Sequence, residues 1–161
     1  MTLQTKLEFV KFLDSDLPQI MPIENQIYPN PWSKKVMSDC IKAGYQCIKG
    51  IDPDHPGTIM CYAVMMVGYQ ETNLLNIGVN PEFNRMGLGS QLLQRLLLIS
   101  RINHAKNLWL EVRASNQAAL GLYKKFEFKK VGLRKNYYQY KNLNGQTIKE
   151  HAILMSRKVM P

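Results

Sequence analysis

The spacing of hydrophobic and polar positions changes along the chain, and each kind of spacing predicts an element. Residues 6–12 alternate weakly between the two classes, which is typical of a strand. Residues 58–69 and 72–79 are long apolar runs suited to the centre of a sheet, with their turn at Gln70–Glu71. The strands predicted in this way are 6–12, 44–49, 58–69, 72–79, 107–112, one near 127–138 and one near 147–157.

Helical spacing appears in four other segments. After Gly87, apolar residues recur on one helix face at Leu88, Leu92, Leu93, Leu96 and Ile99. The predicted helices are 16–27, 33–42, one that begins just after Gly87, and 116–126. Their expected caps are Asp14 or Ser15, then Ser33, and for the last helix Ser115 or Asn116.

The order of these elements predicts an α+β fold. We expect a mixed, mostly antiparallel sheet of about seven strands, flanked by about four helices, with βαβ units in the middle. Residues 51–57 contain two prolines and a glycine and are predicted to form a loop, and Gly145 is expected in the last turn. No linker divides the chain, so residues 1–161 are predicted to form a single domain.

Composition narrows the class of protein. Hydrophobic residues make up 45% of the 161 positions, enough for a sizeable core. The longest apolar run, Ile59–Val67, has nine residues, whereas a membrane span needs roughly 20. The start of the chain resembles no signal peptide, and Cys40, Cys47 and Cys61 show neither a disulfide framework nor zinc spacing. We therefore expect a cytoplasmic protein with no metal.

The net charge of +9 allows three partners: nucleic acid, membrane phosphates or a phosphorylated cofactor. A solvated basic face is the simplest alternative. The basic residues are spread out, and their densest stretches are Lys124–Lys125, Lys129–Lys130 and Arg134–Lys135.

The sharpest local signal is the segment NRMGLG, Asn84 to Gly89, which follows a strand and begins a helix. Unpaired N–H groups at a helix N-terminus attract phosphate, and glycines allow its close approach. A dinucleotide fingerprint would need glycine at position 92, which is Leu92, and a Walker loop would need lysine before Ser90. By itself the segment is also consistent with an ordinary tight turn.

Two longer runs carry a resemblance to a known family. NIGVNPEFNRMGLGSQLL resembles the acetyl-CoA motif of the GNAT superfamily of N-acetyltransferases, and LWLEVRASNQAALGLYKKFEF resembles its second signature. LEVRASN, IENQIYPNPWS and RKNYY are similar to the bacterial ribosomal-protein alanine acetyltransferases in particular. The resemblance implies a three-layer GNAT-like fold with acetyl-CoA in the cleft between the central strands.

The resemblance also implies a role for individual residues. Glu111 matches the general base, and Tyr123 matches the acid that protonates the departing thiolate. The backbone N–H of Val79 is the expected oxyanion donor. The cofactor-binding residues implied are Ile77, Gly78, Val79, Arg85, Met86, Gly87, Leu88, Gly89, Ser90 and Asn116. The acceptor-binding residues implied are Trp32, Arg134, Tyr137 and Tyr138.

Four positions depart from the family pattern. Asn84 replaces the usual Gln or Arg, and His151 replaces a common acidic residue. Glu127 stands where glycine is usual, so either the turn differs or positive φ costs about 1 kcal/mol there. The tail has YYQY, ending at Tyr140, in place of YYP.

Each assignment also has a purely structural alternative. Glu111 could be a solvated strand-end charge, Tyr123 a core residue and Asn116 only a helix cap. Trp32 could simply pack at a rim, and Tyr137 and Tyr138 could belong to an ordinary aromatic strand or stack on nucleic acid.

Together the residues predict acetyl transfer from acetyl-CoA to the α-amino group of a protein. The expected acceptor is the N-terminal alanine of small-subunit ribosomal protein 18, and the protein is expected to be a monomer or weak dimer without direct nucleic-acid or membrane binding. A lysine side chain or a small amine is the alternative acceptor, and a basic RNA-binding module without catalysis is the alternative of another class.

Overall fold

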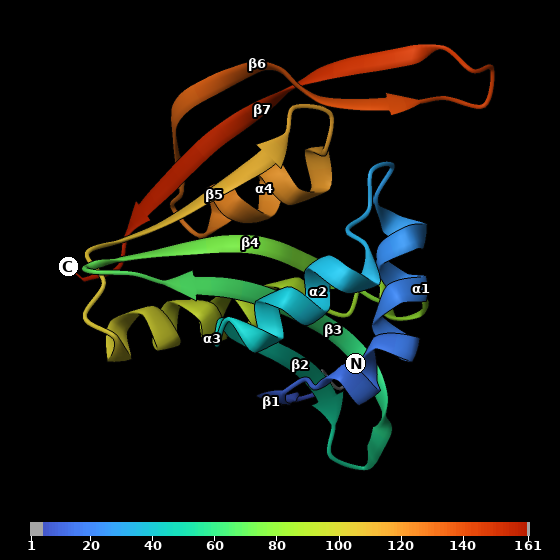
Figure 1. Ribbon diagram of the computed structural model, residues 1–161. Helices are drawn as coiled ribbons and strands as arrows, with labels where there is room; N and C mark the ends of the chain where they lie inside the picture. Colours follow the sequence, from blue (N-terminus) through green and yellow to red (C-terminus); the bar gives the residue numbers. More distant parts are fainter. Residues whose placement is uncertain (1–4, 161) are drawn as a thin grey trace.

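Seven strands form one mixed sheet in the order β1-β2-β3-β4-β5-β7-β6 (Figure 1). The computed structural model describes residues 5–160 of the chain. The strands are β1 (Glu8–Lys11), β2 (Gln46–Asp52), β3 (His55–Val67), β4 (Glu71–Val79), β5 (Asn107–Arg113), β6 (Lys129–Lys141) and β7 (Thr147–Lys158). The helices are α1 (Leu17–Ile27), α2 (Lys34–Lys42), α3 (Leu88–Ile102) and α4 (Gln117–Lys125), with 3-10 turns at Asp14–Asp16 and Pro81–Phe83.

All neighbouring strands pair antiparallel except β4 and β5. These two run parallel and are joined by α3, which forms the βαβ unit. The predicted fold class is therefore confirmed: a mixed, mostly antiparallel sheet with four helices among the described residues. No helix in the range 5–160 has the length and apolarity of a membrane span.

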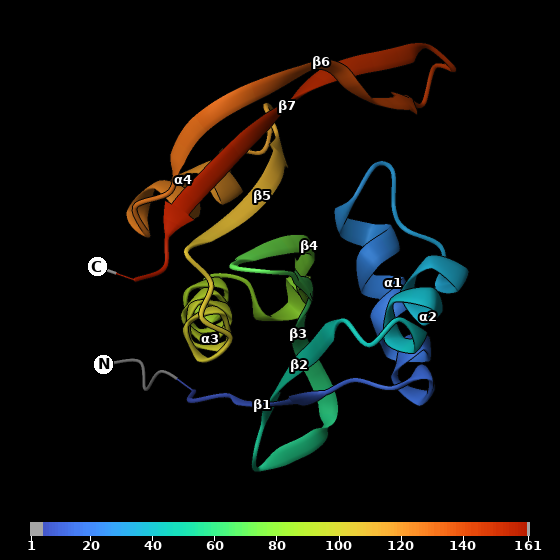
Figure 2. The ribbon, with the colours of Figure 1, turned by 60° about the vertical axis from the view of Figure 1, so that its left-hand side comes forward.

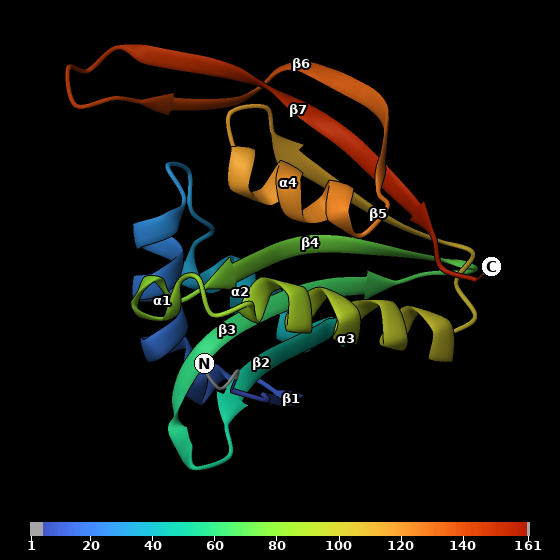
Figure 3. The same ribbon diagram turned by 180° about the vertical axis from the view of Figure 1, so that it is seen from behind.

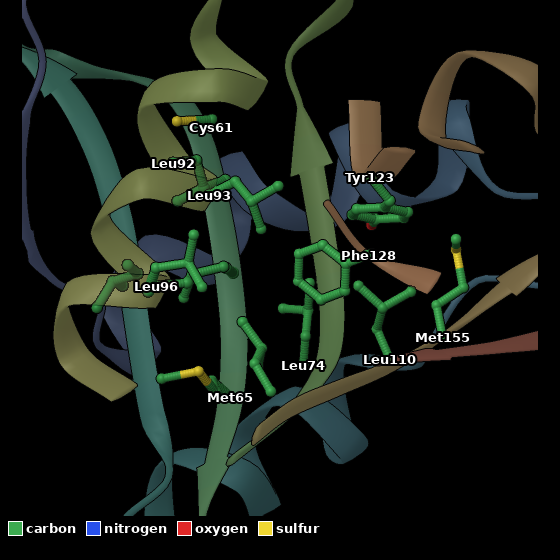
Figure 4. Packing of buried hydrophobic residues seen from close by; sticks show 14 of the residues in the cluster. Cys61, Met65, Leu74, Leu92, Leu93, Leu96, Leu110, Tyr123, Phe128 and Met155 are labelled. Carbon is green, nitrogen blue, oxygen red and sulfur yellow. The ribbon is translucent and has the colours of Figure 1, made fainter. Parts of the chain in front are cut away.

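The sheet separates two hydrophobic clusters, one under α1 and α2 and the other under α3 and α4 (Figures 2 and 3). Side chains alternate across a strand, so β3 contributes to both. Cys61, Ala63 and Met65 belong to the α3 side, whereas Tyr62 and Val64 belong to the α1 side. Figure 4 shows the α3 leucines packed on Cys61 and Met65.

The three cysteines are buried free thiols. Burial raises the pKa of Cys47 to about 11 and the pKa of Cys61 to about 12. Thiolate is therefore scarce at neutral pH, and these residues serve as packing groups rather than nucleophiles.

The predicted loop at 51–57 is wrong, because most of it belongs to a hairpin. Asp52 pairs with His55, and only residues 53–54 form the turn between β2 and β3. The Asp52 carboxylate closes this turn by accepting the N–H of Asp54 at 2.9 Å. The neighbouring β2 residues Ile51 and Asp52 pair with Ile59 and His55 of β3. Residues 56–58, which include Pro56, are therefore extra residues that bulge out of the ladder.

The expected caps hold at two helices and fail at one. Ser33 accepts the N–H of Val36 at 3.2 Å, and Asn116 accepts the N–H of Ala119 at 3.1 Å, as predicted. Neither Asp14 nor Ser15 caps α1, because both lie in the preceding 3-10 turn.

The end of α4 keeps the left-handed turn that glycine usually makes. Glu127 has φ 68°, and its N–H donates to Lys124 O at 3.0 Å. The next N–H, that of Phe128, donates to Tyr123 O at 3.0 Å, which completes a Schellman motif. The rings of Phe128 and Tyr123 also pack with centroids 5.7 Å apart (Figure 4). This turn therefore fixes the position of Tyr123 in the last turn of the helix.

Replacing Glu127 by glycine should stabilise the protein. The strain of a side chain at positive φ is worth about 1 kcal/mol, so Glu127→Gly is expected to raise the free energy of unfolding by about 0.5–1 kcal/mol. Urea unfolding followed by circular dichroism measures the change. Glu127→Ala is the matched control, because it removes the charge but keeps the strain; equal stabilisation by both would contradict the explanation.

Candidate active site

The strands β4 and β5 are paired over only part of their length. Their parallel register runs from Glu71 opposite Asn107 to Leu74 opposite Leu110. Among the described residues no pair follows, although both strands continue. The two central strands therefore separate towards their carboxyl ends (Figure 1).

A bulge in β4 lies at the point of separation. Leu74 and Asn76 pair with the adjacent β3 residues Met65 and Val64, which leaves Leu75 as one extra residue in β4. A bulge bends its strand and increases the local twist. It turns β4 away from β5 while β4 keeps its pairing with β3.

A cavity of about 130 Å³ occupies the gap between the separated strands. The predicted site residues that line it are Ile77, Glu111, Asn116, Tyr123, Trp32 and Tyr138. Further lining residues include Glu24, Tyr28, Asn76 and Arg113, which the motif comparison did not assign. Both predicted catalytic side chains thus open into one cavity.

Glu111 lies on β5 at the cavity wall and forms an ion pair with Arg134. Their Oε1 and Nε atoms are 3.0 Å apart, and the exposed fractions of the two side chains are 25% and 56%. An ion pair this exposed is worth about 1 kcal/mol or less. The contact is weak enough to be exchanged for an incoming cation.

Tyr123 lies on α4 with 3% of its surface exposed. Burial, and secondarily the nearby Tyr138, raise the pKa of Tyr123 above its ordinary value. A buried phenol therefore remains protonated at neutral pH and can act as a proton donor but not as a base.

The glycine loop has the geometry of an anion site. Gly87 precedes α3 with φ 74° and Arg85 has φ 65°, so both lie in the left-handed region. Leu88 is the first residue of α3 and its side chain is buried, so only its backbone is available to a ligand there. A Cβ at Gly89 would lie 3.1 Å from a Leu122 methyl carbon, so this glycine lets α3 and α4 approach closely.

The remaining loop residues are placed around the same helix start. Met86 packs against the core cluster, and Ser90 is half-buried in the first turn of α3. Asn84 is exposed and ends the short 3-10 turn. The loop can therefore offer backbone N–H groups to a phosphorylated ligand, while its apolar side chains anchor it.

On the open edge of β4, only every second residue directs its backbone groups into the gap between β4 and β5. Asn80 N donates to Met60 O of β3 at 2.9 Å, so alternation directs the backbone groups of Gly78 to β3 as well. Ile77 and Val79 then face the gap, and the Tyr28 hydroxyl donates to Ile77 O. The backbone groups of Gly78 are thus directed to β3, and its expected contact with a ligand stays a prediction.

Gly78 has a different role, which is to make room for Tyr62. A Cβ at position 78 would lie 2.4 Å from the Tyr62 ring. The ring is fully buried, and its hydroxyl donates to Glu24 Oε1 at 2.6 Å. Gly78 thus allows Tyr62 to hold Glu24, which lines the cavity.

Glu24 is a buried carboxylate that sequence analysis did not assign to the site. Only 1% of it is exposed, and besides Tyr62 it accepts Asn76 Nδ2 at 3.0 Å and Trp32 N at 2.9 Å. It joins α1 to β3, to β4 and to the segment before α2. The available signal was its position on the apolar face of α1, in helical spacing with Leu17 and Ile20.

Three of the four predicted acceptor residues, Arg134, Tyr137 and Tyr138, form one stack beside the cavity, whereas Trp32 lines the cavity from the segment before α2. The Arg134 guanidinium lies 5.1 Å from the Tyr137 ring centroid, and Tyr137 meets Tyr138 edge-on at 5.1 Å. Arg113 covers Tyr138 at 4.1 Å and is paired with Glu150 at 3.2 Å. Tyr138 lines the cavity, whereas Tyr137 is half-exposed outside it.

Residues 17–128 match the family model described as the acetyltransferase (GNAT) family. This match covers more than half of the chain and includes the glycine loop, Glu111 and Tyr123. The chain belongs to the GNAT family of acetyltransferases.

Individual relatives have a more specific activity in their names than the family does. The chain is 37% identical over 124 residues to the ribosomal protein bS18-alanine N-acetyltransferase of Salmonella typhimurium, covering 77% of this chain and 82% of that one. It is 33% identical over 141 residues to the enzyme of the same name from Haemophilus influenzae, covering 88% and 91%.

Two solved structures have the same fold as this chain. The ribosomal-protein-S18-alanine N-acetyltransferase of Escherichia coli superposes with TM-score 0.83 at 31% identity, covering 97% of this chain and 96% of that one. Arabidopsis thaliana NAA60 in complex with acetyl-CoA shares the fold with TM-score 0.79 at 20% identity, covering 95% and 98%.

The Glu24 contacts predict a stability effect. Glu24→Gln places an amide N–H₂ against a donor, so one buried group loses its partner and the free energy of unfolding should fall by about 1–3 kcal/mol. Urea unfolding provides the measurement, with Glu8→Gln on exposed β1 as the control. A Glu24→Gln protein as stable as wild type would show that the carboxylate is not required.

Proposed function

We propose that this protein transfers the acetyl group of acetyl-CoA to the N-terminal α-amino group of a protein, and that the acceptor is the N-terminal alanine of small-subunit ribosomal protein 18. One observation carries the proposal: Glu111 and Tyr123 open into the same cavity at the separation of β4 and β5. Acetyl-CoA supplies the activated acetyl group.

The residues present fit this cosubstrate. The α3 N-terminus follows two left-handed residues, Arg85 and Gly87, and can hold the pyrophosphate on its N–H groups. Ile77 and Val79 face the gap with their backbone groups and can hydrogen-bond the pantetheine arm. Val79 N–H is the candidate donor to the acetyl carbonyl oxygen. Asn116, besides capping α4, lines the cavity.

Glu111 is the proposed base. An N-terminal amine has a pKa of about 7.7–8.0, so most of it is protonated at neutral pH and cannot attack. The acceptor ammonium can replace the Arg134 guanidinium on Glu111, which then takes the proton directly or through one water. Arg134, released from Glu111, remains stacked on Tyr137 beside the acceptor.

Tyr123 is the proposed acid. Its hydroxyl is protonated at neutral pH because burial raises its pKa, so it can give a proton to the leaving thiolate. The Schellman turn and the Phe128 ring hold the phenol in place. No covalent intermediate with the protein is required.

The cavity favours a small first residue on the acceptor. Its volume is about 130 Å³, and Trp32 and Tyr138 form part of its wall. Two carboxylates, Glu24 and Glu111, line it, while the cation Arg113 is paired with Glu150. An ammonium group next to a small side chain therefore fits both the charge and the size of the space.

A peptide panel tests the acceptor. Mass spectrometry after incubation with acetyl-CoA should find acetylation on a free Ala-initiated ribosomal peptide, and none on its N-blocked form or on a lysine peptide. Glu111→Gln should lower kcat/KM by about 10²–10⁴-fold, because the amide cannot accept the proton. Glu8→Gln, at an exposed position of β1 outside the cavity, is the matched control. Equal acetylation of lysine and of the blocked peptide would discard the N-terminal specificity.

Tyr123→Phe tests the acid. The variant should keep its fold, because the ring packing remains, and should lose about 10²-fold in kcat. An ordinary tyrosine has a pKa of about 10, and burial raises the pKa of Tyr123 above that value. The phenol therefore stays protonated between about pH 8 and about pH 10, and the kcat of the wild type should not fall over this range. Stopped-time assays across this range, with the Phe variant alongside, give the comparison. A variant as fast as wild type would exclude Tyr123 as the acid.

A further inference from the structure

The net charge of the chain is concentrated in its last part. Residues 124–158 hold ten Lys or Arg and two Glu, a net charge of +8. Residues 1–123 hold eleven basic and ten acidic residues, a net charge of +1. Nearly the whole excess of +9 therefore lies on the end of α4 and on the two strands β6 and β7.

Part of this charge surrounds a second, open cleft of about 950 Å³. Its lining residues come from the last turns of α3 and α4, the start of β5, the start of β6 and the end of β7. Its cations are Arg101, Lys124, Lys129, Arg157 and Lys158, and among residues 5–160 its acidic lining residue is Glu127. The candidate active site lies further along β5. Asn107 lines the cleft and Glu111 lines the active-site cavity, and four residues of strand separate them by about 13 Å.

These cations have no acidic partner within residues 5–160. Arg157 donates to Phe126 O at 2.9 Å, and Arg101 donates to Val159 O at 3.4 Å. Arg101 and Lys124 stabilise the carboxyl ends of their helices, but Lys129 and the Arg157–Lys158 pair lie on strands and have no such role. Like charges gathered around a cleft focus a positive potential that attracts an anion.

An exposed aromatic ring stands at the same end of the sheet. Tyr69, in the turn between β3 and β4, is 90% exposed, and the next residue, Gln70, accepts the N–H of Lys106 just before β5. Bases of single-stranded nucleic acid stack on such rings.

The basic surface continues along β6. This strand is the outer edge of the sheet, and Lys129, Lys130, Arg134 and Lys135 are all exposed on it. It runs from the cleft to the acceptor side of the active site (Figure 1).

We propose that the cleft and the β6 edge bind the phosphate backbone of RNA. The charge and shape identify a polyanion, and the choice of RNA rests on the proposed function, because a ribosomal-protein acceptor is itself a partner of RNA. Binding there would hold the active site beside a protein N-terminus that projects from an RNA surface. This revises the expectation of no direct nucleic-acid contact.

Fluorescence anisotropy with a labelled single-stranded RNA of mixed sequence, titrated at several KCl concentrations, tests the proposal. The variant is Lys124→Gln/Lys129→Gln/Lys158→Gln. Its matched control, Lys11→Gln/Lys34→Gln/Lys42→Gln, loses the same charge from exposed lysines outside the cleft. The cleft variant should bind on the order of tenfold more weakly, with a salt slope smaller by about 2, and the control should stay within about twofold of wild type.

Three results would overturn the proposal: no salt-dependent RNA binding, equal weakening by both variants, or poly-glutamate binding as tight as RNA, which would indicate an acidic protein partner. Acetylation of the free Ala peptide should be unchanged in both variants. RNA binding by a protein that acetylates no peptide would support the cleft while refuting the proposed function, and acetylation without RNA binding would do the reverse.

Discussion

The separation of β4 from β5 is the structural feature on which the rest of the site depends. β5 pairs with β7 over all seven of its residues, so its position is fixed from that side. β4 is fixed by β3, and the bulge at Leu75 turns it away after four pairs with β5. The gap exposes the backbone edge of Ile77 and Val79, and it gives Glu111 on one strand and Tyr123 on the following helix a common space.

Two carboxylates line this space under different constraints. Glu24 is buried and accepts three hydrogen bonds from neutral donors, so it is held in place and cannot reorient without loss of all three. Glu111 is partly exposed and has one cationic partner, Arg134, whose side chain is more than half exposed. A fixed carboxyl group that shapes the cavity therefore lies beside one whose partner can be exchanged, and this arrangement suits the proposed binding and deprotonation of an ammonium group.

The separation of charge within the molecule resolves an apparent conflict. A chain with net charge +9 should repel the ammonium group of the proposed acceptor, yet the excess lies on α4, β6 and β7, while Glu24 and Glu111 line the cavity itself. Short-range attraction inside the cavity is less screened than repulsion across solvent, which falls off over about 8 Å at physiological ionic strength. The basic outer surface is then free to bind a different, anionic partner.

The sequence by itself determined what local spacing encodes: the leucine face of α3, the cap Ser33, a cap at Ser115 or Asn116, the glycine loop before α3 and the seven strands. Its motifs also identified the GNAT family and selected Glu111 and Tyr123. It failed at residues 51–57, where prolines suggested a loop although a hairpin bulge absorbs them. It also could not show which backbone groups of residues 77–79 face the gap, because that depends on the pairing with β3. Tertiary structure alone decided that Glu24 reaches Tyr62, 38 residues away, and that Arg134 meets Glu111 across the intervening β7. Such contacts depend on strand order and register, which bring together residues whose sequence neighbours carry no trace of the pairing.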